Sequence, residues 1–351
     1  MPVELHARHA VAISLSMEEQ VHSSSVDGGT LTLRELQRQL ATLLPEARAA
    51  SGEGTLELVS QGNDAPRLIS ATVLEEGVLR ARTVTGAPEP GFRAFLDGTQ
   101  RSQVASYIGN VAVVLGHVAA VVRERRDRRM HTWQAPLRET RIYAPRAVLS
   151  SVTWNTLAAD FGSLLVDTTA GTTDGGLHPF ALRDAAFHRV QAHREQVERR
   201  LAEQWCAEER DPIFIDGGIS GSEKVAVSSF TVGVVKSHRT LYAEGDALET
   251  VLSLGMRQRS SIFRITSPRR TTVASWYLRL RDPSGYDPMW GLVRVEMALA
   301  DARAIDRLST RADEISRWIL AEASPLALPD SRWDKMVYGV RDCEEFLRAV
   351  Q

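Results

Sequence analysis

The sequence predicts an α/β protein in which helices flank a mixed β-sheet. The first observation is the order of its periodic segments: three strands, a helix, a strand, a helix, further strands and a final helix. The second is the apolar spacing in the longest helical segment, which repeats by fours and sevens as on one helix face. The third is composition, because 351 residues, 43% hydrophobic and 25% charged, can bury a sizeable core.

The first 88 residues are interpreted as an N-terminal extension that precedes a main domain at 89–351. Thr30 or Thr32 would cap a helix running to about Leu44, because the leucines at 33, 36, 40 and 43 share one face. Residues 54–84 have the pattern of short strands joined by turns.

A stronger strand pattern begins at Gly91. Three apolar runs follow one another, which predicts an antiparallel meander, at 92–96, 104–115 and 117–123. The first run stops at Asp97-Gly98, and Gly116 separates the second from the third. Residues 130–177 look irregular, apart from a possible strand at 140–144.

The second half of the chain predicts a long helix at 179–209 and then alternating elements. The apolar stripe of this helix includes Val190, Val197, Leu201 and Trp205. The elements expected after it are strands at 213–215 and 231–235, a helix at 243–256, strands at 261–265, 273–280 and 291–297, and a helix at 302–323. A tail follows from Ser324.

Composition excludes several classes of protein. No apolar segment approaches the roughly 18 residues that a bilayer-spanning helix needs, and no signal peptide is recognisable. Cys206 and Cys343, the two cysteines, exclude a disulfide framework and lack metal-ligand spacing. We therefore expect a soluble cytoplasmic protein without a membrane partner.

Arginines are concentrated in two stretches although the net charge is only −2. The first stretch is 123–129, and the second contains Arg257, Arg259, Arg264, Arg269 and Arg270. Guanidinium groups bind phosphates bidentately, so the second stretch is a candidate nucleic-acid-binding surface. The alternative for each stretch is a solvated face.

Two similar tetrapeptides carry the candidate chemistry. Phe-Leu-Asp-Gly places Asp97 after one predicted strand, and Phe-Ile-Asp-Gly places Asp216 after another. If these strands are neighbours, the two carboxylates repel unless a cation neutralises them, and Mg²⁺ or Mn²⁺ prefers such oxygen ligands. The alternative is that each Asp-Gly is simply a turn.

A third carboxylate is expected from the long helix. At about 100° per residue, Glu198 lies on the shoulder of the apolar stripe, whereas Glu195 and Glu203 point away from it. Glu198 is therefore the candidate third metal ligand with Asp97 and Asp216. The alternative is an ion pair with Arg194, one helical turn earlier.

These features resemble the NurA nucleases over residues 91–350. The resemblance rests on Phe-Leu-Asp-Gly-Thr at 95–99, Ile-Asp-Gly-Gly at 215–218, Val-Gly-Val-Val-Lys-Ser at 232–237, Val-Arg-Val-Glu at 293–296, and Asp-Ser-Arg-Trp-Asp-Lys-Met-Val-Tyr-Gly-Val at 330–340. It implies an RNase H-like fold with inserted strands, and manganese-dependent endonuclease and 5′-to-3′ exonuclease activity on DNA. It also implies a homodimer that docks on a hexameric HerA-type ATPase. It matches Lys236 to a lysine able to touch the scissile phosphate, and the alternative is a surface lysine at the end of a strand.

The sequence also departs from the NurA pattern. Many members end with a Tyr-Pro and an Ala-His pair, but no histidine follows Tyr338 here. A non-catalytic adaptor of a HerA-type ATPase, or an RNase H-like nuclease acting on RNA, are therefore alternatives. Glu296 is expected in a cross-strand ion pair, and Asp301 either caps the last long helix or supplies a fourth carboxylate.

Overall fold

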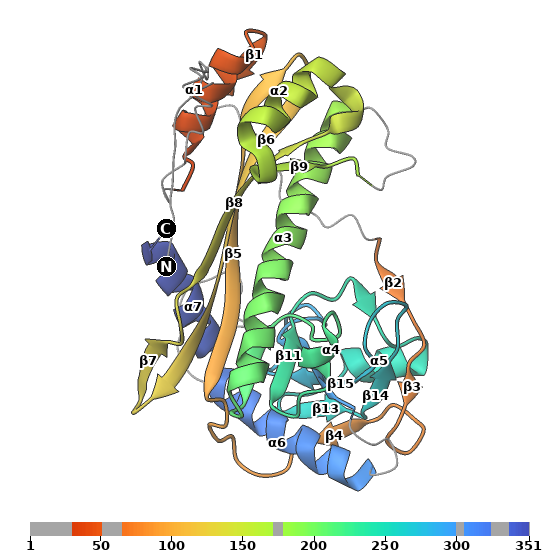
Figure 1. The fold of residues 1–351 in the computed structure, drawn as a ribbon. Coiled ribbons are helices and arrows are strands. Elements are labelled where there is room, and N and C mark those ends of the chain that lie inside the picture. The colour runs from red at the N-terminus through yellow and green to blue at the C-terminus, as the bar shows by residue number, and fades with distance from the viewer. Residues whose placement is uncertain (1–29, 51–64, 171–177, 300–304, 324–336, 351) are drawn as a thin grey trace, which may run out of the picture.

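A computed structural model describes residues 30–50, 65–170, 178–299, 305–323 and 337–350 (Figure 1). Asp301, most of the Gly/Thr-rich stretch at 168–176 and the tail motif up to residue 336 lie outside these ranges. None of the described helices is long and apolar enough to cross a membrane.

Five strands form the centre of one large mixed sheet. β5 (Ala94–Ile108), β6 (Val111–Arg126) and β8 (Leu137–Ala144) are the antiparallel meander. β10 (Ile213–Asp216) runs parallel to β5 on its other side, and β11 (Thr231–Val235) runs parallel to β10. The resulting order is β8-β6-β5-β10-β11, and the predicted α/β class with a mixed sheet is confirmed.

Further strands extend this sheet beyond β11. β16 (Leu292–Ala298), β15 (Val273–Arg279), β14 (Phe263–Ile265) and β13 (Gln258–Ser260) are the inserted strands. The smaller strands are β7 (Arg129–Thr132), β9 (Leu165–Asp167) and a parallel pair, β2 (Arg67–Leu68) with β12 (Thr240–Leu241).

The segment expected to be an N-terminal extension contributes strands to the same sheet. β1 (Ala47–Ala49) pairs with β5, β3 (Thr72–Val73) with β14, and β4 (Ala81–Thr83) with β13. The main-chain hydrogen bonds of this segment are therefore part of the main sheet rather than of a separate unit.

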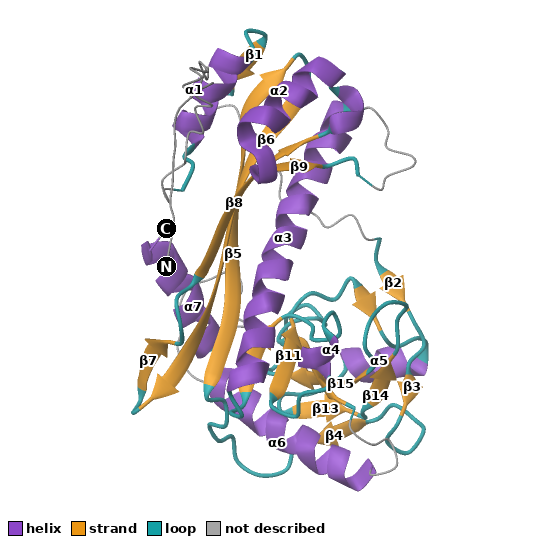
Figure 2. Ribbon diagram, in the orientation of Figure 1, coloured by secondary structure: helices purple, strands orange, loops and turns teal. Residues whose placement is uncertain are grey.

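Helices cover both faces of the sheet (Figure 2). α3 (Pro179–Glu208) runs along one face and buries the predicted stripe of Val190, Val197, Leu201 and Trp205. α6 (Ile305–Ala323) and α7 (Tyr338–Val350) lie on the other face with a second apolar core, which includes Phe95, Phe214 and Trp276. The short helices α4 (Glu223–Ala226) and α5 (Asp246–Leu252) lie near the inserted strands.

A third apolar core lies at the far end of the long β5–β6 hairpin, where Figure 1 shows a separate upper lobe. α1 (Leu33–Leu43) and α2 (Ser151–Phe161) supply Leu36, Leu40 and Leu157 to it, with the 3₁₀ helices Arg146–Val148 and Gly162–Leu164 nearby. α1 begins at the predicted cap, because Thr32 accepts a hydrogen bond from the Glu35 amide while the Glu35 carboxylate accepts one from the Thr32 amide.

Two expectations about strand ends were wrong. β5 does not stop at Asp97 but continues to Ile108, since the polar residues after Asp97 still pair with β6. Gly116 lies inside β6 rather than at a hinge, and a Cβ there would come within 2.7 Å of the Tyr143 and Val190 side chains. The turn of the hairpin is at Gly109 instead.

Candidate active site

Asp97 lies inside the sheet at the point where a neighbouring strand ends. On one side it pairs with Val121 of β6, and on the other side β10 pairs with β5 only as far as Leu96. The side chain is buried, at 5% exposure, and its Oδ1 accepts a hydrogen bond from the Gly98 amide at 2.8 Å. Because β10 ends at this point, the sheet leaves one side of the buried Asp97 carboxylate uncovered.

Asp216 is the last residue of β10, and its position fits the strand-end expectation. Gly217 follows with a φ of 132°, a backbone conformation that side-chain-bearing residues rarely adopt. Lys236 comes directly after β11, the parallel neighbour of β10, and its Nζ donates to Asp216 Oδ2 at 2.8 Å. The structure therefore brings Lys236 to Asp216, as an ion pair.

Glu198 approaches the same place from α3, which crosses over β5. A Cβ added to Gly98 would overlap Glu198 Oε1, so the glutamate lies directly against the Gly98 backbone. Of the glutamates weighed from sequence, Glu195 is exposed and Glu203 accepts from Ser222, so Glu198 is the one that meets Asp97. The alternative contact is present as well, because Arg194 donates to Glu198 Oε1.

The carboxylates influence one another electrostatically. Burial raises the pKa of Asp97 well above its ordinary range, and the charges of Asp216 and Glu198 raise it further against the opposing effect of Lys236. Burial also raises the pKa of Glu198 to about 7, although Arg194 opposes this shift. Burial is therefore the main reason that both carboxyl groups are harder to ionise than free ones.

The residues suit a divalent cation chemically, but they do not form a finished ligand set. Carboxylate oxygens are the ligands that Mg²⁺ and Mn²⁺ prefer, and added positive charge would relieve the repulsion at Asp97. Within the described ranges, however, no group of three or more His, Cys, Asp or Glu side chains is placed to hold a metal ion together. Lys236 and Arg194 contact the oxygens of Asp216 and Glu198 instead.

A cavity of about 390 Å³ opens beside this group. Asp97, Asp216 and Arg194 line it, whereas Glu198, which contacts Arg194, is not among the lining residues. Glu344 and Arg348 of α7 also line it, and sequence reasoning missed both because residues after 324 were expected to be a tail. The apolar spacing of Val340, Cys343 and Leu347 is the signal that predicts this helix.

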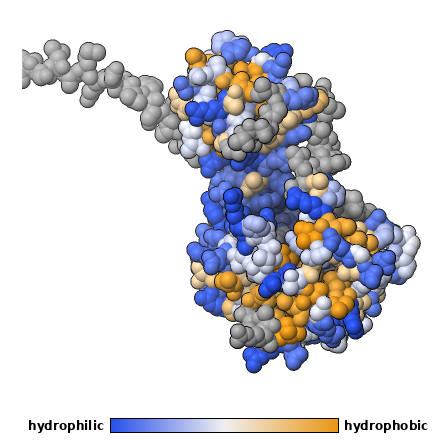
Figure 3. All heavy atoms as spheres, turned by 90° about the vertical axis from the view of Figure 1, so that its right-hand side faces the viewer, coloured by the Kyte–Doolittle hydropathy of each residue, from blue (hydrophilic) through white to orange (hydrophobic). Residues whose placement is uncertain are grey.

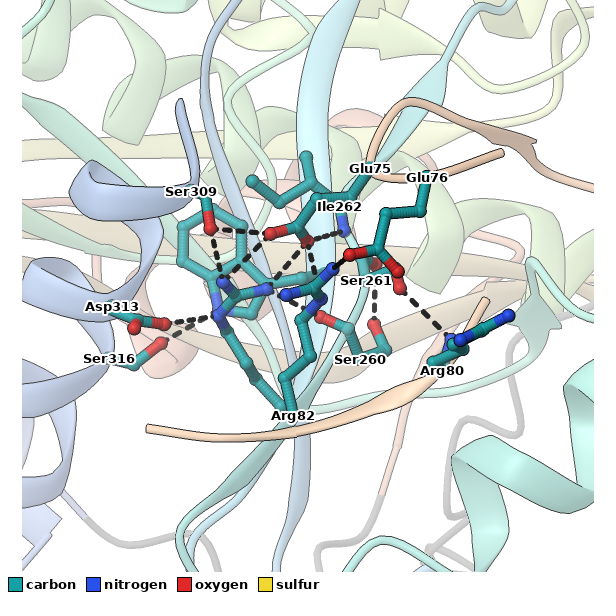
Figure 4. A network of polar contacts seen from close by, with 12 residues as sticks. Glu75, Glu76, Arg80, Arg82, Ser260, Ser261, Ile262, Ser309, Asp313 and Ser316 are labelled. Atoms are coloured by element: carbon teal, nitrogen blue, oxygen red, sulfur yellow. Dashed lines mark hydrogen bonds and ion pairs between the residues drawn. The ribbon is translucent and has the colours of Figure 1, made fainter. Parts of the chain in front are cut away.

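Arg259 was predicted to bind nucleic acid, and this prediction is wrong. Its side chain is buried at 1% exposure and donates to Glu75 at 2.8 and 3.1 Å and to Asp313 at 2.5 Å. Figure 4 shows this buried network, which joins the segment before β4 to α6. A guanidinium satisfied by two carboxylates inside the protein cannot reach a phosphate.

The other four arginines of that stretch have different surroundings. Arg264, Arg269 and Arg270 are exposed, while Arg257 is half-buried and donates to the Gly86 carbonyl. Of the predicted set, Arg270 lines a second and larger cavity, of about 780 Å³, beside α3. The stretch is therefore not one continuous binding surface.

Glu296 is buried in an ion pair, but the pair lies within one strand. Its Oε1 accepts from Arg294, two residues earlier on β16, at 2.5 Å, and its Oε2 accepts from the Ile219 amide at 2.8 Å. Glu296 thus fixes the turn after Asp216 rather than bridging two strands.

Comparison with known proteins reveals a similarity of fold. No protein-family model matches the sequence, and no curated protein matches it. The structure is similar to the crystal structure of the NurA nuclease from Sulfolobus solfataricus, with a TM-score of 0.43 and 11% identity. The match covers 75% of this chain and 81% of that chain, and the likeness is one of fold alone.

Proposed function

We propose that this protein is a metal-dependent nuclease that hydrolyses phosphodiester bonds in DNA. The observation that carries the proposal is the meeting of Asp97, Asp216 and Glu198, three carboxylates from three elements, where β10 ends beside β5. Buried carboxylates that raise one another's pKa are a common feature of sites that bind cations or move protons.

The roles follow from these positions. Asp97, Asp216 and Glu198 would hold Mn²⁺ or Mg²⁺, which, when bound, polarises the phosphodiester and activates water. Asp216 would then exchange its contact with Lys236 for the ion, and the Lys236 ammonium beside it would contact the scissile phosphate. Glu198 must likewise turn from Arg194, leaving that guanidinium on the cavity wall to receive the substrate backbone.

The wider proposal follows the sequence resemblance to the NurA nucleases. We propose endonuclease and 5′-to-3′ exonuclease activity by a homodimer that works with a hexameric HerA-type ATPase. End processing of DNA in repair, or degradation of phage DNA, would use this combination of a motor and a nuclease.

One observation favours a second function, that of a non-catalytic adaptor for such an ATPase. The ion pairs of Lys236 with Asp216 and of Arg194 with Glu198 satisfy two of the three candidate ligands without a metal. If these pairs persist when Mn²⁺ is present, the carboxylates are structural and the site is degenerate.

The test is cleavage of linear DNA by purified protein in the presence of Mn²⁺, together with calorimetric titration of Mn²⁺. We expect Asp97→Asn and Asp216→Asn to lower the rate by at least about 100-fold, because loss of a metal ligand costs more than the 10–100-fold seen for outer-shell partners. Glu208→Gln is the matched control, since Glu208 is an exposed α3 glutamate that pairs with Gln134. Absence of both metal binding and cleavage, with and without an ATPase partner, would establish the adaptor instead.

A further inference from the structure

The larger cavity, of about 780 Å³, lies between α3 and the inserted strands and is lined by four arginines from separate parts of the chain. Arg67 belongs to β2, Arg239 precedes β12, Arg270 lies between β14 and β15, and Arg294 belongs to β16. We call this the arginine cavity. In Figure 3 the molecule narrows between two lobes, and the surface there, where Figure 1 places the middle of α3, is mainly hydrophilic.

The balance of charge on its wall is positive. Two carboxylates face the four guanidinium groups, and one of them, Glu296, is already engaged by Arg294 and by the Ile219 amide. Glu195 of α3 is the other. Four separated segments that converge with the same charge repel one another, so an anion between them lowers the electrostatic energy of the cavity.

One buried polar atom on this wall lacks a partner. His188 lines the arginine cavity from α3, and its Nε2 is buried without a hydrogen-bond partner among the described residues. Buried polar groups are nearly always hydrogen-bonded, so this nitrogen requires a water molecule or a ligand atom.

The arginine cavity begins one residue from the candidate active site. Val235 and Ser237 line it, whereas Lys236 between them turns to Asp216. Successive side chains of an extended chain point to opposite sides, so β11 separates the two spaces at a single residue. Because β11 ends at Val235, a DNA strand whose scissile phosphate lies at Asp216 would enter the arginine cavity by passing the end of β11.

The aromatic content of the cavity wall indicates whether the bases or the phosphates of a DNA strand are bound. Tyr242 is the wall's aromatic residue, and the Arg294 guanidinium already lies 5.1 Å above its ring. Proteins that read single strands through their bases use open aromatic platforms. Here Arg294 covers one face of the Tyr242 ring, while Arg67 and Arg270 are exposed, which favours contacts to phosphates and little sequence preference.

From these observations we propose that the arginine cavity binds the backbone phosphates of the DNA strand next to the scissile bond. The proposal rests on the nuclease function for the identity of the ligand. The β2–β12 pair positions two of the arginines, because the Arg67 amide donates to the Arg239 carbonyl at 2.7 Å. The N-terminal segment thereby takes part in substrate binding.

The test is fluorescence anisotropy with a labelled single-stranded DNA oligonucleotide in EDTA, from 50 to 200 mM salt, so that no cleavage occurs. Arg270→Ala and Arg67→Ala are expected to weaken binding several-fold and to reduce the salt slope by about 0.7 each, the value for one lost phosphate contact on a single strand. Arg264→Ala is the matched control, since Arg264 is exposed on β14 but not on the wall. An oligonucleotide with neutral methylphosphonate linkages should bind wild type and Arg270→Ala equally.

Each outcome separates this proposal from the nuclease proposal. Equal binding and equal salt slopes for wild type, Arg270→Ala and Arg67→Ala would refute phosphate binding in the arginine cavity, whether or not the protein cleaves DNA. Stronger binding of an RNA of the same sequence, lost in Arg270→Ala, would overturn DNA as the ligand. Arginine-dependent DNA binding without cleavage at any Mn²⁺ concentration would support DNA binding in the arginine cavity and refute the proposed nuclease activity.

Discussion

At the residue scale, Asp97 is held where its negative charge is unfavourable unless a cation is bound. Burial and two neighbouring carboxylates favour its protonated form, while one amide and Lys236 oppose them. Evolution commonly retains such groups at functional sites at the expense of stability. This predicts that removing the charge of Asp97 weakens metal binding and increases the stability of the metal-free protein.

We therefore expect Asp97→Asn to be more stable than wild type in EDTA at pH 8, by roughly 0.5–2 kcal/mol. Because the pKa of Asp97 is raised on folding, and that of Glu198 to about 7, the folded protein binds more protons than the unfolded chain above about pH 4. Stability contributed by these groups is present at low pH and falls as pH rises towards 7 and beyond. Urea unfolding at pH 5 and pH 8 should show the advantage of the variant growing with pH.

Asp167→Asn serves as the control of opposite sign. Burial alone would raise the pKa of Asp167, but hydrogen bonds from Thr169 and Arg146 outweigh it and lower the pKa. The charge of Asp167 therefore stabilises the folded protein at any pH above the pKa of the unfolded chain. We expect Asp167→Asn to lower the stability of the protein at pH 8. If Asp97→Asn also lowers the stability at pH 8, the charge of Asp97 stabilises the folded protein and our interpretation of its environment is wrong.

Individual residues of the site were predictable where a local pattern points to them. Helical geometry alone selects Glu198, since its neighbours on the apolar stripe dictate which face of α3 meets β5. Arg259 was misassigned because sequence shows charge but not burial, and its partner Glu75 is far away in the chain. Pairings of this kind depend on tertiary structure.

At the element scale, two identical Asp-Gly pairs serve different purposes. Gly217 provides the positive φ of a turn after a strand, with open space around it. Gly98 has extended backbone inside β5 and provides close approach, because Glu198 and the Ala119 carbonyl occupy the space of a side chain. The similarity of the motifs predicted the location of both aspartates but not the continuation of β5.

We expect Gly98→Ala to destabilise the protein by about 1–3 kcal/mol and to displace Glu198, since a Cβ would lie 2.9 Å from the Ala119 carbonyl oxygen and overlap Glu198. Mn²⁺ affinity should fall with it. Gly221→Ala is the control, because a Cβ there comes no nearer than 3.6 Å to Arg199 and requires no positive φ. Unchanged thermal unfolding and Mn²⁺ binding in Gly98→Ala would show that α3 does not press on β5 at this point.

At the scale of the whole molecule, the order of elements was predictable and the extent of the sheet was not. Apolar periodicity located α3, β10, β11, β15 and β16 to within a few residues. It missed α2 and α7, and it could not show that strands of two or three residues near the N-terminus pair with β14 and β13. Such short strands carry little local signal, since distant partners supply their hydrogen bonds.

This integration leads to a prediction about a truncated protein that begins at residue 89. Such a variant lacks α1, β1, β2, β3 and β4, and it leaves Arg259 buried without Glu75. Removing one partner of a buried ion pair alone costs about 3–5 kcal/mol, a large part of the stability of an ordinary protein. We expect the truncated protein to be insoluble or to unfold without cooperativity in a thermal melt.

Three further variants test why the truncated protein would fail to fold. A variant beginning at residue 30 keeps every contact described above and is the reference for the truncated protein. In the full chain, Glu75→Gln should lower stability by a similar 3–5 kcal/mol, whereas Glu76→Gln should change it by less than about 1 kcal/mol, because Glu76 pairs with Arg82 at the surface. A cooperative melt of the protein beginning at 89 would instead establish residues 1–88 as a separable extension, and would place the strands β3 and β4 among accessory parts of the sheet.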